Sequence, residues 1–362
     1  MIKVPLSNPK PDIDNFIKVI KGEIIPQKPP LVELFLDYEI VRDISKNFLN
    51  KQWVETSEDK EQQKKYLTNW IEVYWRTGYD FVRMSGGLEF QTKSRQAEDA
   101  SSMSGKRNWA EEGKGPISTW EEFEKYPWPD VKKADLWQYE SVAKNIPQGM
   151  GLFVCPTSGF LEIPLDILFG YENLCYLLYD QPELVEAVFK KAGETIYQFY
   201  ERLLGLPNLV GFFQGDDMGY KTGTLISAEH LKRLSLPWHK KLAHLAHKNS
   251  LIYILHSCGQ LDEIMNNLID DVKIDARHSF EDEGNPVIEF KKKYGKKIGV
   301  LGGIDVDKLC RLSEDRLRVH IRNIIKECLP DGRFAVGSGN TVANYVPVAN
   351  YIAMVEEALN FF

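Results

Sequence analysis

The sequence lacks the features that mark several large classes of protein. Its 362 residues include only five cysteines, at positions 155, 175, 258, 310 and 328, an odd number without paired spacing. This pattern argues against a disulfide framework and favours a reducing compartment. No run of about 18 apolar residues occurs, and the first residues have no continuous apolar segment of the secretory type. We therefore expect a cytoplasmic protein without a membrane-spanning segment.

An excess of positive charge is absent as well. The 45 Lys and Arg residues are outnumbered by 52 Asp and Glu residues, which gives a formal net charge of -7. Without a basic stripe that could neutralise many phosphates, nucleic-acid binding is not expected as a main role. The densest basic cluster, between Lys291 and Lys297, lies where a helix is predicted to lead into a strand, and a solvated face is its simpler interpretation.

The sequence does contain a recurring pattern, in which a short β-rich run is followed by a polar or glycine-rich turn and a longer amphipathic stretch. Eight such runs occur, at residues 31–39, 80–87, 151–159, 209–217, 251–258, 272–280, 298–305 and 333–340. Strands that alternate with helices pair in parallel, and eight is the number that closes a (β/α)8 TIM barrel. A doubly wound open sheet is the alternative, but no G-x-G-x-x-G follows an early strand.

We thus predict an α/β fold with one barrel domain, residues 31–362, preceded by an N-terminal extension, residues 1–30. Residues 88–118 form a long polar excursion after the second strand, which suggests a lid or a partner surface. Residues 227–249 have a helical pattern, with Ser227 as the expected N-cap and a break expected at Pro237.

Active sites of such barrels lie at the carboxyl ends of the strands, where the loops converge. The residues that the pattern places there form a polar and largely acidic rim: Asp37, Ser85, Cys155, Ser158, Asp216, Asp217, His256, Cys258, Glu281, Asp305, Ser338 and Asn340.

His256 and Cys258 attract attention because two residues that are two apart on a strand face the same way. Imidazole and thiolate both bind Zn²⁺, and a catalytic zinc needs three protein ligands and an open position. This spacing supplies two ligands. The alternative interpretation is a small core cysteine beside a hydrogen-bonded barrel histidine.

Asp216 and Asp217 end another strand, where neighbouring side chains point to opposite faces. Only one of them is therefore expected to enter the barrel, while the other holds a loop or caps a helix. Among the remaining histidines, His278 lies on a strand and could reach the mouth of the barrel. The others fall in predicted helices at surface-like spacing, namely His230, His239, His244, His247 and His320.

Taken in order, these strand ends resemble those of the uroporphyrinogen decarboxylase superfamily, which includes corrinoid-dependent methyltransferases of the methylcobamide:coenzyme M type. The matching stretches begin at GDDMGYKTG (215–223), ILHSCGQ (254–260), IGVLGGID (298–305) and VGSGN (336–340). The resemblance covers most of residues 151–362, whereas the first third shares only the strand-helix rhythm. It implies a (β/α)8 barrel with its site in the mouth.

In the zinc methyltransferase branch, an H-x-C-G motif and the cysteine of a later G-C-G turn bind the metal. His256 and Cys258 match the first two positions, but the turn in this sequence is Gly337-Ser338-Gly339. The decarboxylase branch has a histidine in that turn and an N-terminal arginine-rich motif, and the sequence lacks both. Either a carboxylate therefore completes the metal site, with Asp216, Asp217 and Glu281 as the candidates, or zinc is not bound as it is in the family.

The resemblance implies a methyltransferase that moves a methyl group between a small methylated substrate and a corrinoid (cobalamin) presented by a partner protein, with zinc assistance. Asp217, Glu281 and Ser338 are expected in the chemistry, and Ser158, Asp216, Asp305 and Asn340 in substrate contacts. A decarboxylase acting on a tetrapyrrole, in porphyrin biosynthesis, is the alternative. A barrel that binds a small molecule without catalysis is the third class. The fold also allows a homodimer through outer helices or long loops.

Overall fold

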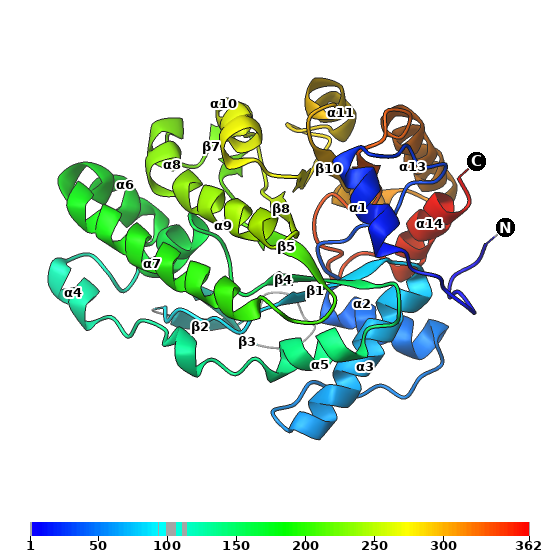
Figure 1. Cartoon of the computed structure of the whole chain (residues 1–362), viewed down its shortest axis with the longest axis horizontal. Helices are drawn as coiled ribbons and strands as arrows, with labels where there is room; N and C mark the ends of the chain where they lie inside the picture. The colour runs from blue at the N-terminus through cyan, green and yellow to red at the C-terminus, as the bar shows by residue number, and fades with distance from the viewer. Residues whose placement is uncertain (1, 93, 99–105, 111–113, 362) are drawn as a thin grey trace.

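The computed structural model of the chain describes residues 2–92, 94–98, 106–110 and 114–361. Its centre is a curled parallel sheet of seven strands in the order β1-β4-β5-β8-β9-β10-β11 (Figure 1). The strands are β1 Phe81–Ser85, β4 Gly151–Cys155, β5 Leu209–Gly215, β8 Ile252–His256, β9 Ala276–His278, β10 Gly299–Leu301 and β11 Phe334–Ala335. These strands lie within seven of the eight predicted runs, and their parallel pairing is as predicted.

The first predicted strand, residues 31–39, is the point at which the predicted closed barrel is not reproduced. Leu31 and Leu36 make isolated parallel bridges to Val336 and Val342, beside and beyond β11. The Leu36 N–H donates to the Tyr74 hydroxyl at 3.1 Å and not to a neighbouring strand, and Pro29 and Pro30, which precede the segment, have no N–H to donate. Among the described residues, no bridge joins this segment to β1. The observed sheet is therefore a seven-stranded curl with an irregular segment at the eighth position.

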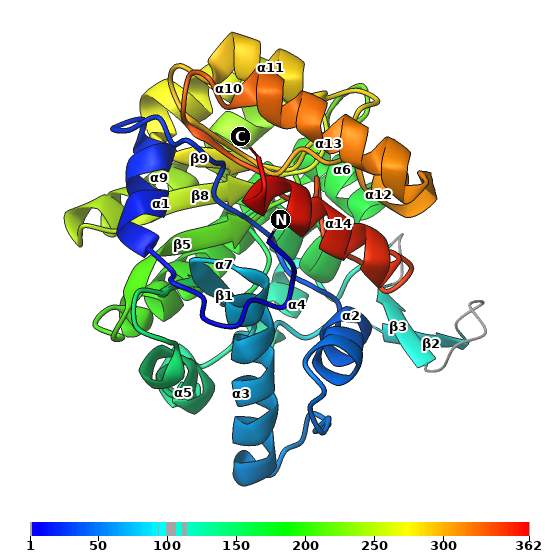
Figure 2. The ribbon, with the colours of Figure 1, turned by 90° about the vertical axis from the view of Figure 1, so that its right-hand side faces the viewer.

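The helices that follow the strands lie outside the curled sheet (Figure 2). They are α2 Tyr38–Asp43, α3 Lys60–Thr77, α4 Trp120–Lys125, α5 Trp137–Asn145, α6 Tyr171–Asp180, α7 Pro182–Leu203, α8 Ala228–Leu234, α9 Leu236–Lys248, α10 Asp262–Asn266, α11 Val287–Tyr294, α12 Val306–Arg311, α13 Glu314–Cys328 and α14 Val348–Leu359. No helix in the described part of the chain is long and apolar enough to cross a membrane.

Local sequence signals explain several helix ends. Ser227 caps α8 by accepting a hydrogen bond from the His230 N–H at 3.2 Å, and Pro237 lies in the first turn of α9, so the predicted N-cap and break are confirmed. The polar excursion at residues 88–118 contains an antiparallel pair, β2 Ser94–Glu98 and β3 Lys106–Ala110. Its predicted role as a lid or partner surface stays a prediction.

The amino-terminal end of the sheet is closed by α1, Ile13–Lys21, which lies within the predicted N-terminal extension. Phe16 of α1 is fully buried, and its ring centre lies 5.0 Å from that of Phe81 and 6.3 Å from that of Phe153. Alternate strand residues, among them Phe213, complete this apolar interior. Because α1 fills one end, the polar residues gather at the carboxyl end of the strands.

Candidate metal centre

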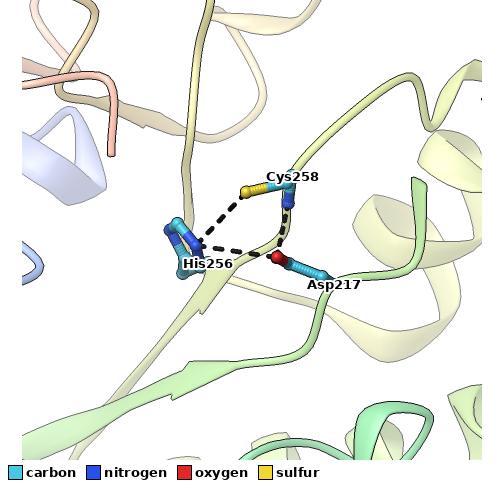
Figure 3. A group of neighbouring side chains, drawn as sticks. All are labelled: Asp217, His256 and Cys258. Atoms are coloured by element: carbon cyan, nitrogen blue, oxygen red, sulfur yellow. Dashed lines mark hydrogen bonds and ion pairs between the residues drawn. The ribbon is translucent and has the colours of Figure 1, made fainter. Parts of the chain in front are cut away.

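Three potential metal ligands come together at the carboxyl ends of β5 and β8 (Figure 3). The Nε2 atom of His256 lies 3.6 Å from Cys258 Sγ and 3.6 Å from Asp217 Oδ1. One ligand atom from each of the three residues lies within 4.8 Å of the other two. Among the described residues, this is the one such group found. The set provides an imidazole, a thiol and a carboxylate, which are the ligand types that zinc prefers.

Backbone pairing brings these residues together. The Asp216 N–H donates to the His256 carbonyl at 2.9 Å, which extends the register of β5 and β8 by one residue. The chain therefore places Asp217 beside Cys258, and the Cys258 N–H donates to Asp217 Oδ1 at 2.8 Å. Of the three carboxylates that the sequence left open, Asp217 is the one that lies beside His256 and Cys258.

His278, the last residue of β9, holds the ring of His256. The two Nδ1 atoms lie 2.8 Å apart, so one ring donates and the other accepts. This contact leaves Nε2 of His256 turned toward Asp217 and Cys258, as a metal ligand requires. Burial lowers the pKa of His278 to about 3, and burial followed by the neighbouring His278 lowers the pKa of His256 well below its usual value. Both rings are therefore neutral at pH 7.

The sulfur of Cys258 accepts two hydrogen bonds, from Ser279 Oγ and Asn340 Nδ2, each at 3.3 Å. Burial, and next the Asp217 carboxylate, raise the pKa of the Cys258 thiol to about 12. Without a cation the thiol therefore keeps its proton. A bound divalent cation reverses this preference because thiolate is the ligand form.

Arg277 supports the turn that carries Cys258. This residue of β9 is buried, and its guanidinium donates to the carbonyls of Ser257 at 3.3 Å and Gly259 at 2.8 Å. Burial lowers its pKa to about 10, and its terminal carbon lies 5.0 Å from the Phe290 ring centre. The sequence offers little signal for this role, because Arg277 lies among other polar residues in the stretch 272–280.

Asp216 does not reach the mouth. It is fully buried and accepts hydrogen bonds from the N–H groups of Leu161 and Glu162 at 3.0 Å, and it lies 2.6 Å from His239 Nε2. Asp216 therefore holds the loop after β4, while Asp217 points toward Cys258, so the two aspartates have the opposite orientations expected from the sequence. The predicted substrate contact of Asp216 has no support in this arrangement.

The expectation of a surface position for His239 is wrong. The side chain is fully buried, and its Nδ1 atom lies 2.6 Å from the Tyr253 hydroxyl. A signal was present in the sequence, since His239 is three residues from both Leu236 and Leu242 and so lies on the apolar stripe of α9.

Ser338 is turned away from the three ligands. It is fully buried, its N–H donates to Glu33 Oε1 at 2.9 Å, and its hydroxyl contacts Glu33 Oε2 and the Asn340 carbonyl. The flanking Gly337 is required because an added Cβ would lie 1.7 Å from the Val32 carbonyl oxygen. Burial raises the pKa of Glu33 to about 8. Ser338 stands at the third ligand position that the resemblance implies, and its partner is Glu33, which was not predicted from the sequence.

Four predicted residues line one cavity of about 520 Å³: Cys258, Glu281, Asp305 and Asn340. Within it, Asp305 caps α12 by accepting from the Asp307 N–H at 2.8 Å and also accepts from the Asp282 N–H at 2.7 Å. Ser158 is exposed on the loop after β4 and is not among the described residues that line this cavity.

Two acidic residues that the sequence analysis missed adjoin Asp217. Burial, and then the charges of Asp216 and Asp217, raise the pKa of Glu162 to about 8 and that of Asp166 to about 6. Burial raises the pKa of Asp217 as well. A bound cation would favour the ionised forms of these carboxyl groups and would be attracted to them in return.

Solved structures share this fold. A methyltransferase from Methanosarcina mazei superposes with a TM-score of 0.68 at 13% identity, over 96% of this chain and 97% of its own. A B12-independent methionine synthase from Shewanella sp. W3-18-1, in complex with selenomethionine, gives a TM-score of 0.53 at 10% identity, over 83% of this chain and 88% of its own. At these identities, the likeness concerns the fold alone. No curated protein matches the sequence.

A family model matches the region of the chain that contains the three candidate ligands. It is the model of uroporphyrinogen decarboxylase (URO-D), and it matches residues 148–361, which include all three ligands. This match covers more than half of the chain. The chain therefore belongs to the uroporphyrinogen decarboxylase (URO-D) family.

Proposed function

We propose that Asp217, His256 and Cys258 bind a zinc ion and that the protein transfers a methyl group between a small substrate and a corrinoid presented by a partner protein. The observation that carries the proposal is the group of three ligand atoms within 4.8 Å of one another. Three protein ligands of mixed type leave a fourth position open, which is typical of catalytic rather than structural zinc. The fold shared with a methyltransferase and a methionine synthase supports the reaction class.

The donor set fits zinc on chemical grounds. The ring of His256 is neutral and its other nitrogen is occupied by His278, so Nε2 is available as a ligand. Ser279 and Asn340 direct hydrogen-bond donors at Cys258 Sγ, where they stabilise the thiolate form. Zinc would act as a Lewis acid that activates the methyl acceptor or polarises the donor.

The chain's own residues would position the substrate. The cavity of about 520 Å³ beside Cys258, with Glu281 and Asp305 on its wall, would give a small molecule access to the proposed metal ligands. Asn340 connects the proposed metal ligands to the cavity, because it donates to Cys258 Sγ and also lines the cavity.

The test is methyl transfer from methylcobalamin, the probe for the corrinoid, to 2-mercaptoethanol under anaerobic conditions, followed by the cobalamin absorption spectrum. The zinc-loaded protein is expected to demethylate the probe, whereas Cys258→Ala loses the activity. Cys310→Ala, a cysteine of α12, is the matched control and should retain it. Loss of methyl groups at the same rate in Cys258→Ala and the native protein would contradict the proposal.

The match to the family model favours a second candidate, decarboxylation of a tetrapyrrole. In that reaction Asp217 would stabilise a protonated intermediate electrostatically without a metal. Incubation with uroporphyrinogen and chromatography of the oxidised products separates the two candidates. Products with fewer carboxyl groups from zinc-free protein would favour the decarboxylase, and the proposed methyl transfer predicts none.

A further inference from the structure

Arg83 is a buried cation inside the sheet that the proposed chemistry does not use. It belongs to β1, two residues after Phe81, whose side chain packs in the apolar interior. Residues two apart on a strand share a face, so Arg83 also points inward, one layer closer to the mouth. The residue is 7% exposed.

Two of its three nitrogens have fixed partners. Nε donates to the Phe213 carbonyl at 2.9 Å, and Nη1 donates to Ser85 Oγ at 2.6 Å. The guanidinium carbon lies 5.2 Å from the Phe213 ring centre. Within the described part of the chain, no carboxylate lies within 4.0 Å of this guanidinium. A buried charge without a counter-charge is costly, so a bound anion would be stabilised beside this guanidinium.

The third nitrogen, Nη2, faces a space left by Gly215. A Cβ atom built on Gly215 would have only two close neighbours, His256 Cδ2 at 3.9 Å and Arg83 Nη2 at 4.0 Å. Both are ordinary contact distances, and Gly215 has no positive φ, so neither backbone strain nor a close approach requires glycine there. The missing side chain leaves room between the free guanidinium nitrogen and the ring of a proposed metal ligand.

We propose that Arg83 Nη2 binds a carboxylate of the substrate, so that the site takes a carboxylated methyl donor or acceptor. The inference rests on the proposed function, because the metal would hold the reacting end of the same molecule. A carboxylate is planar and matches the guanidinium group, and the space beside Gly215 is that of one missing side chain. Glu162 and Asp217 adjoin the metal ligands and offer no cation, so a carboxylate would be attracted toward Arg83 instead.

The first test compares two thiols in cobalt-substituted protein, where thiolate binding gives a visible absorption band. Mercaptoacetate has a carboxylate and 2-mercaptoethanol does not. A hydrogen bond to a charged group corresponds to a preference of about tenfold or more, so mercaptoacetate should bind at least that much more tightly. Arg83→Met should reduce the ratio of the two dissociation constants to about one. An unchanged ratio in Arg83→Met would overturn the inference.

Two variants keep this test decisive if Arg83→Met folds poorly. Gly215→Ala places a methyl group in the space at ordinary contact distances, so it should fold normally and weaken mercaptoacetate while sparing 2-mercaptoethanol. Arg202→Met removes a half-buried arginine of α7 that donates to the Ala134 carbonyl at 3.0 Å, and it should leave the ratio unchanged. Equal mercaptoacetate binding in Gly215→Ala and the native protein contradicts a ligand in this space.

A metal-free experiment separates this inference from the proposed function. In protein with ¹⁵N-labelled arginine, the Arg83 Nε–Hε signal is identified by its absence in Arg83→Met. Acetate should shift that signal saturably, whereas acetamide, of the same shape but neutral, should not. A stronger response to methanesulfonate than to acetate would overturn the carboxylate assignment, and no response to acetate would overturn the inference itself. Failure of cobalt to bind, with a saturable acetate response, would reject the metal site alone.

Discussion

His278 is expected to control metal affinity although it is not a ligand. Its Nδ1 atom lies 2.8 Å from Nδ1 of His256, and both rings are buried. Partners that orient a metal-ligating histidine typically contribute about 10- to 100-fold to metal affinity. This range corresponds to about 1.4–2.7 kcal/mol of binding free energy. His278→Phe keeps an aromatic ring at the position but removes the hydrogen bond, so zinc should bind to it 10- to 100-fold more weakly.

The assay is competition for zinc with a chromophoric chelator at pH 7.5, with circular dichroism to verify the fold. His247→Phe is the matched control, because His247 makes a comparable contact, 2.8 Å to Asp275, outside the proposed site. Its zinc affinity should equal that of the native protein. If His278→Phe is folded and binds zinc as tightly as the control, His278 does not orient His256 and the reasoning is refuted.

Three further predictions concern buried groups. Burial raises the pKa of Glu33 from 4.5 to about 8, so between these values the folded state holds a proton that the unfolded chain loses, and the free energy of unfolding falls by on the order of 1.4 kcal/mol per pH unit. In urea unfolding, the stability of Glu33→Gln relative to the native protein should therefore be greater at pH 8 than at pH 5. An equal difference at both pH values would contradict this. Asp216→Asn disturbs the buried contact with His239 and should lower the free energy of unfolding by about 3 kcal/mol, whereas Asp130→Asn, at an exposed ion pair with Lys133, should cause a much smaller loss. Equal losses in the two variants would refute this. The pKa of the Cys258 thiol is about 12 without metal, so zinc binding at pH 7 should release about one proton from the thiol, which an indicator dye can measure. A zinc affinity that does not change between pH 6 and pH 8 would contradict thiolate ligation.

The strand positions were predictable because burial on both faces of a parallel strand produces short apolar runs, such as the one from Leu209 to Phe213. Closure of the barrel was not predictable from the same pattern. Residues 31–36 have the composition of a strand, but their pairing depends on where β11 ends and on the hydroxyl of Tyr74, which is remote in sequence. Local residue types carry no information on either point.

The site was partly predictable for a similar reason. His256 and Cys258 lie on one strand, so their common orientation follows from a spacing of two. Which carboxylate joins them depends on the register between β5 and β8, and this selects Asp217 over Asp216 and Glu281. Glu33 and Arg83 were missed because each is a single charge in an apolar run, and only the assembled sheet shows what surrounds it.

The resemblance-based expectation that the third ligand is a carboxylate is supported by the geometry. The hydroxyl of Ser338 is committed to Glu33, so it does not face the ligands, whereas Asp217 Oδ1 lies 3.6 Å from His256 Nε2. A carboxylate in place of a thiolate would make a bound zinc ion more electron-deficient and a stronger Lewis acid. The exchange is therefore compatible with metal-assisted chemistry at this position.

X-ray absorption at the zinc edge, measured on protein loaded with one equivalent of zinc, tests the central claim most directly. The site predicts one sulfur ligand at about 2.3 Å and nitrogen or oxygen ligands at about 2.0–2.2 Å, with the sulfur contribution lost in Cys258→Ala. A first shell without sulfur in the native protein, or a sulfur ligand that persists in Cys258→Ala, would contradict the account.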